Sequence, residues 1–198
     1  MFPPEPEDGV FSGNRKNRSM LFWTWNRIFY ALPLAPCQKC IDYKGKKIKT
    51  EGLYFCDKKM IQLAFSEYVD SIEKNATHEL AHHLNFELLA KSSNYTITRA
   101  FNRLVGDRFI DDNGKLFRLV PGKNQFALFN YMHNCKRNEK AKDAKFPTAY
   151  SQSNALEFVA ECMAEYYHGD KIDLEDALTA EEQEALKFLF VNCKETKQ

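Results

Sequence analysis

The sequence predicts an α+β fold that is mostly helical, with a small sheet or hairpin beside one long helix. Two observations predict it. Apolar residues recur at steps of three and four from Ser66 to Ala90, which is the pattern of a helix with one buried side. Two short apolar runs separated by a polar turn precede this helix, as in a β-hairpin.

Size and composition are those of one globular unit. The chain has 198 residues, and its 44% hydrophobic content, with 16 Phe and 9 Tyr, is ample for one core. Residues 1–18 are acidic and rich in proline, so we predict a flexible N-terminal tail, followed by a single domain over 19–198. The net charge of +1 provides no overall field to attract nucleic acid or an anionic membrane. We therefore expect neither as a partner.

One apolar stretch, Met20 to Pro36, follows basic residues and has to be considered as a signal-anchor. Asn26 and Arg27 interrupt it, and it is shorter than the roughly 20 residues that a membrane span needs. Without a signal-anchor we expect a cytoplasmic location, or secretion into a host-cell cytosol without a cleavable signal peptide. In a cytosol the thiols are expected to stay reduced. The thiols belong to six cysteines: Cys37, Cys40, Cys56, Cys135, Cys162 and Cys193.

The first expected elements are a helix and a hairpin. Aromatic residues are dense from Met20 to Leu32, which predicts a helix closed by Pro33. The apolar runs Leu53–Cys56 and Ile61–Phe65 flank the polar turn Asp57–Lys59, which predicts the hairpin.

Four further helices are expected after the long one, and two of them have a local signal at one end. Gly169 ends one of them, and a capping box, Thr179-Ala180-Glu181-Glu182, opens the last. Their expected ranges are Thr98–Leu104, Phe126–Met132, Asn154–His168 and Thr179 to about Asn192.

The long helix carries the motif His78-Glu79-Leu80-Ala81-His82. Histidines four residues apart project from one face of a helix about one turn apart, close enough to bind one zinc ion. Glu79 follows the first histidine, where its carboxylate can accept a proton from water beside the metal. The motif therefore predicts a hydrolytic zinc site.

The two sides of this helix are expected to differ. Leu80 lies about 200° around the helix from His78, so the apolar stripe is predicted to be buried and the histidine face to open onto a cleft. His83 lies off the ligand face and is expected to pack or to bond to the backbone. The alternative, that both histidines of the motif are structural, stays open.

A catalytic zinc usually takes three protein ligands, and a downstream helix offers the third. Glu157 and Glu161 share one face of the helix Asn154–His168, as suits a ligand and an acceptor that holds an imidazole N–H. In a competing interpretation, Glu157 is only the capping partner of Asn154. If Glu157 is not the ligand, then Glu161, His133 and Asp107 are the other candidates.

The segment from Tyr150 to Glu161, YSQSNALEFVAE, resembles the second motif of gluzincin-type peptidases related to the anthrax lethal factor catalytic domain. The bacterial Pro-Pro endopeptidases and the Mlc titration factor A peptidases are similar there. In that group a Tyr stands seven residues before the ligand Glu, and aromatic-x-Ala-Glu follows it. The resemblance covers Ser66–Leu84 and Tyr150–His168 and implies a zincin-like fold. One departure is the interval between the two motifs, which is longer than the lethal factor type leads us to expect.

The resemblance also implies a role for each of six side chains. His78, His82 and Glu157 would bind Zn²⁺, Glu79 would be the general base, Tyr150 would stabilise the transition state, and Glu161 would hold a ligand histidine. A rival metal site, Cys37-Gln38-Lys39-Cys40, has no second cysteine pair to complete it.

These expectations favour a monomeric zinc endopeptidase that acts on a specific intracellular protein, with a bacterial effector in a host cytosol as one setting. Two alternatives stay open. The first is a regulatory peptidase that acts mainly by binding a transcription factor. The second is a non-catalytic zinc-binding module, against which the presence of Glu79 argues.

Overall fold

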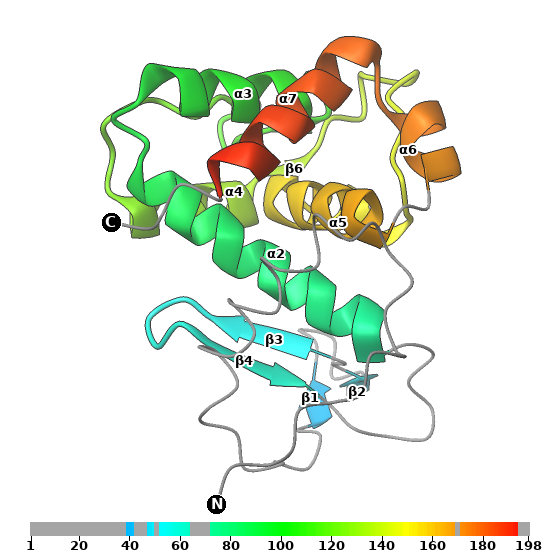
Figure 1. Cartoon of the computed structure of the whole chain (residues 1–198). Coiled ribbons are helices and arrows are strands. Elements are labelled where there is room, and N and C mark those ends of the chain that lie inside the picture. The colour runs from blue at the N-terminus through cyan, green and yellow to red at the C-terminus, as the bar shows by residue number, and fades with distance from the viewer. Residues whose placement is uncertain (1–38, 42–46, 50–51, 64–71, 169–170, 194–198) are drawn as a thin grey trace, which may run out of the picture.

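The computed structural model describes residues 39–41, 47–49, 52–63, 72–168 and 171–193 of the chain (Figure 1). Within these ranges the fold is mostly helical with small antiparallel sheets, which confirms the predicted α+β class. The helices are α2 (Ile72–Ala90), α3 (Tyr95–Val105), α4 (Gln125–Asn134), α5 (Ala155–His168), α6 (Lys171–Ala177) and α7 (Ala180–Asn192), with the 3₁₀ helix η2 (Tyr150–Gln152) before α5. The predicted tail, the predicted helix Met20–Leu32 and Cys37 lie outside the described residues.

Three two-stranded antiparallel sheets accompany these helices. They pair β1 (Lys39–Ile41) with β2 (Lys47–Lys49), β3 (Gly52–Phe55) with β4 (Met60–Leu63), and β5 (Phe109–Ile110) with β6 (Lys136–Arg137). The β3–β4 pair is the predicted hairpin, and its turn ends at Lys59, whose φ of 49° is left-handed. Phe65, the predicted end of the second strand, lies outside the described residues.

Helix α2 lies at the centre of the described structure, between the β3–β4 hairpin on one side and α4 and α5 on the other (Figure 1). Leu80 on the apolar stripe is 1% exposed, and His78 and His82 on the other face are 8% and 6% exposed. The histidine face is therefore more closed than the sequence predicted, because it packs against α5. None of the helices in the described ranges combines the length and apolar content that a membrane crossing requires.

The ends of the outer helices follow from their caps. Asn94 accepts a hydrogen bond from the Thr96 N–H, which starts α3 three residues before the predicted Thr98. Asn124 caps α4 in the same way. The predicted capping box between Thr179 and Glu182 opens α7. The short helix α6 is an element that was not predicted.

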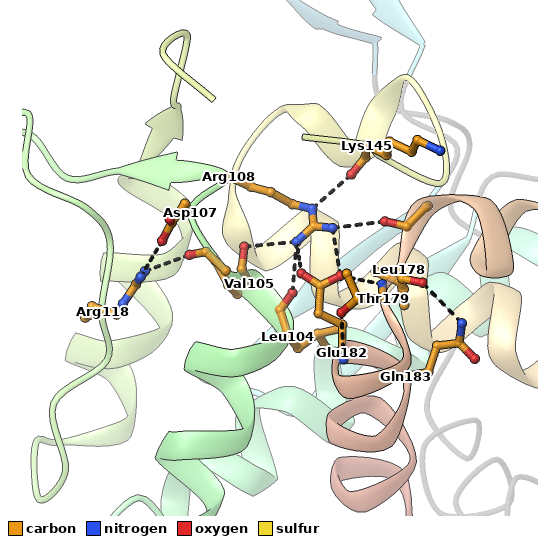
Figure 2. A network of polar contacts seen from close by, with 12 residues as sticks. Leu104, Val105, Asp107, Arg108, Arg118, Lys145, Leu178, Thr179, Glu182 and Gln183 are labelled. Carbon is orange, nitrogen blue, oxygen red and sulfur yellow. Dashed lines mark hydrogen bonds and ion pairs between the residues drawn. The ribbon is translucent and has the colours of Figure 1, made fainter. Parts of the chain in front are cut away.

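Arg108 connects the elements around α5 (Figure 2). Its buried guanidinium forms a two-pronged ion pair with Glu182 and donates to the carbonyl oxygens of Lys145 and Ala177, each at 2.9 Å. The guanidinium carbon also lies 4.9 Å from the centre of the Phe158 ring on α5. This one side chain therefore links the end of α3, the 140–145 segment, the α6–α7 junction and the helix that carries Glu157.

We predict that Arg108→Met lowers the free energy of unfolding by about 3–5 kcal/mol, because it leaves the Glu182 carboxylate buried without its partner. The measurement is urea unfolding followed by far-UV circular dichroism. Lys187→Gln is the matched control, since it removes an ion pair with Glu184 that lies on the surface of the same helix, α7. Equal unfolding midpoints for both variants would contradict the role assigned to Arg108.

Candidate metal centre

The two motif histidines meet as the helical spacing predicts. The ring centres of His78 and His82 on α2 are 4.6 Å apart, and their planes are nearly perpendicular, at 88°. Both side chains are buried, so their nitrogens need partners from within the protein.

Helix α5 supplies that partner. Glu157 Oε2 lies 3.0 Å from His78 Nε2 and 3.2 Å from His82 Nε2. Two ligand atoms about 2.05 Å from a tetrahedral ion are about 3.3 Å apart, so these spacings suit a single ion. Across the described residues, His78, His82 and Glu157 are the set of three metal-ligating groups that converge, with ligand atoms within 4.8 Å of one another. This set could hold a metal ion.

Glu157 takes part in the capping of α5 through its backbone N–H and not through its carboxylate. Asn154 Oδ1 accepts from the Glu157 N–H at 3.0 Å, as an N-cap does, while the carboxylate turns to the histidines. The other candidate ligands lie elsewhere. His133 is exposed, and Asp107 forms a surface ion pair with Arg118 at 2.6 Å.

Glu161 holds His78 from the other side of the ring. Its Oε1 lies 2.6 Å from His78 Nδ1, and its Oε2 accepts from the Thr148 hydroxyl at 2.7 Å. This contact directs Nε2 of His78 toward Glu157, as carboxylates do behind metal-binding imidazoles. Thr148 is a site residue that the sequence analysis missed, because no local pattern marks it.

The carboxylates make the centre attractive to positive charge. Burial alone would lower the pKa of His78, but hydrogen bonds to Glu157 and Glu161 outweigh it and raise the pKa to about 10. For Glu157 the directions are reversed. Burial alone would raise the pKa of its carboxyl, but the charge of His82 and hydrogen bonds from both histidines hold that pKa well below its usual range. A metal cation would benefit from the same negative potential, in competition with protons.

Glu79 lies beside this centre without belonging to the ligand set. Burial raises the pKa of its carboxyl, and the nearby charges of His82 and His78 oppose that rise. The carboxylate also accepts a hydrogen bond from the backbone of Tyr54 in β3. A buried carboxylate whose pKa is raised is suited to accept a proton.

Tyr150, at the start of η2, borders the centre on its exposed side. Its ring centre is 5.7 Å from that of His78, its hydroxyl is hydrogen-bonded to Glu157, and the residue is 57% exposed. Burial of the hydroxyl and the charges of Glu157 and Glu79 raise its pKa above the usual value. The phenol thus stays protonated at neutral pH and can donate a hydrogen bond.

Two further expectations concern histidine and cysteine. His83 packs against Tyr54, and its Nδ1 lies 3.1 Å from the Tyr54 hydroxyl, so the expected packing is found but the polar partner is a side chain. Cys56, Cys135 and Cys162 are free thiols, and the Cys193 thiol donates to the carbonyl oxygen of Leu189. No cysteine joins a metal-ligating cluster within the ranges that the structure describes.

Comparisons with protein-family models, with curated proteins and with solved structures found no match to this chain.

We predict about one bound metal ion per chain, and loss of that ion in His78→Ala and in His82→Ala, since each variant removes one of three ligands. The measurement is metal content after gel filtration, by plasma mass spectrometry. His83→Ala is the matched control on the same helix and should keep its ion. Full metal content in both ligand variants would show that the ion binds elsewhere.

A second prediction separates the two carboxylates of α5. Glu161→Gln should weaken metal binding by about 10- to 100-fold, because it alters the support of His78 but removes no ligand. Glu157→Gln should weaken it further than that. Competition with a chelator gives both affinities in one buffer. A Glu157→Gln protein that binds as tightly as the wild type would restrict Glu157 to its backbone capping role.

Proposed function

We propose that this protein is a zinc-dependent endopeptidase. His78, His82 and Glu157 would bind the ion, and the convergence of these three side chains from two helices is the observation that carries the proposal. Two imidazole nitrogens and one carboxylate oxygen form a ligand set of catalytic zinc, which leaves a coordination position open. The segment from Tyr150 to Glu161 resembles gluzincin-type peptidases, and this resemblance supports the same choice of metal and a zincin-like fold.

The reaction would be hydrolysis of a peptide bond. Zinc in such a ligand set provides a Lewis acid that lowers the pKa of water toward about 7 and polarises the scissile carbonyl. Glu79 would take the proton from the attacking water and deliver it to the leaving amine. Its position beside the ligands and its raised pKa support this role.

Two other side chains would assist. The Tyr150 hydroxyl, which stays protonated, would turn its one proton from Glu157 to the oxyanion that develops in the transition state. Glu161 would hold the His78 ring in its ligating orientation, as its 2.6 Å contact supports. The exposed surface of Tyr150 marks the side from which a polypeptide would approach.

The proposed substrate is a specific intracellular protein, and an effector that works in a host cytosol is one setting for such an enzyme. Neither nucleic acid nor membrane is part of the proposal, since the net charge is +1. The enzyme would act as a monomer.

The test is a comparison of the proteins that are cut when wild type or Glu79→Gln is added to a cell lysate. We expect Glu79→Gln to keep its zinc but to cleave the substrate about 10²- to 10⁴-fold more slowly, because it removes the base but no ligand. New N-termini identified by mass spectrometry are the measurement. Glu87→Gln is the matched control, since Glu87 lies on the same helix in a partly exposed ion pair with Lys59.

Each result of this comparison has a defined meaning. Cleavage by wild type and Glu87→Gln but not by Glu79→Gln supports the proposal. A protein that a pull-down captures with wild type and with Glu79→Gln alike, and that neither cuts, would favour the regulatory peptidase that acts mainly by binding a transcription factor. Zinc retention without any cleavage would favour the non-catalytic module.

A further inference from the structure

Gly52, the first residue of β3, lies against the side chain of Glu79. A Cβ atom at this position would come within 2.7 Å of both Cγ and Oε1 of Glu79 and within 3.0 Å of Cδ. Carbon atoms pack at about 3.5–4.0 Å, so a methyl group there cannot coexist with the observed carboxylate position.

The backbone itself gives no reason for a glycine here. The glycines with positive φ within the described ranges are Gly106, Gly114 and Gly122, and Gly52 is not among them. It pairs with Leu63 in a regular antiparallel register. Glycine in a strand is unfavourable unless another group approaches closely, and the group that approaches here is the Glu79 carboxylate.

The strand cannot easily move away to make room. Two residues along β3, the Tyr54 ring packs edge-on against His83 and Phe86 of α2 and against Phe129 of α4. The backbone of Tyr54 also donates the hydrogen bond to Glu79. Because β3 is fixed to α2 at Tyr54, a side chain added at position 52 would displace the flexible Glu79 side chain.

We propose that Gly52 is a positioning residue for Glu79, whose missing side chain creates the space in which the β3 backbone holds the base beside the metal ligands. This inference rests on the proposed peptidase function for its catalytic consequence, but the placement of Glu79 can be tested without it. The residue acts through Glu79 and needs no contact with the substrate.

The test uses the full-length Gly52→Ala variant with zinc bound. Zinc content and urea midpoint should equal those of the wild type, since no ligand is touched. In its crystal structure the Glu79 side chain should move by at least about 0.8 Å, the shift that restores ordinary contact distances. On a peptide that spans the cleavage site, kcat should fall by about 100-fold with KM little changed, as displacement of a catalytic group by about 1 Å does.

The matched control is Leu53→Ala, which alters the next residue of the same strand, an exposed side chain. It should keep the wild-type kcat. Three results would overturn the inference: an unmoved Glu79 in Gly52→Ala, a kcat within twofold of wild type, or loss of folding in Gly52→Ala but not in Leu53→Ala. If wild type cuts no protein, the proposed function fails, and the position of Glu79 in the two crystal structures alone decides the role of Gly52.

Discussion

One carboxylate between two imidazoles fixes the geometry on which the rest of this structure depends. Burying Glu157, His78 and His82 separately would be costly, because each would lose water without gaining a partner. Together they place Glu157 Oε2 3.0 Å from His78 Nε2 and 3.2 Å from His82 Nε2. These contacts hold only for one placement of α5 against α2, so they specify the packing of the two central helices as well as the candidate metal centre.

The placement is secured from both sides. Behind α5, the Arg108 guanidinium lies on the Phe158 ring, one residue after Glu157, and joins that helix to α3 and α7. Across α2, the β3–β4 hairpin packs against the face opposite α5 and reaches Glu79 through its backbone. The polar groups at the centre thus gain rigid supports, which is what a site needs when its groups must stay within a fraction of an ångström.

Local patterns predicted what local forces decide. The capping box of Thr179, the hairpin and the one-turn spacing of His78 and His82 all depend on neighbours within a few residues, and each is found in the structure. Glu157 was predicted although its partner His78 is 79 residues away, because the histidine motif calls for a third ligand and two glutamates share one face of a later helix. Thr148 and Gly52 were missed because their partners are distant in sequence. The burial of the histidine face against α5 was missed for the same reason, since periodicity shows an apolar stripe but not a second packing surface.

The long interval between the two motifs can be understood in the same terms. Although it separates His82 from Glu157 in sequence, it supplies α3, α4 and the β5–β6 pair. Its large apolar residues form much of the core, with Phe101, Phe109 and Phe117 fully buried. Arg108, which supports α5, also belongs to it. Helices α3 and α4 of this interval therefore pack against both α5 and α2. The length of the interval does not separate the two helices, because Arg108 within it contacts Phe158 beside Glu157.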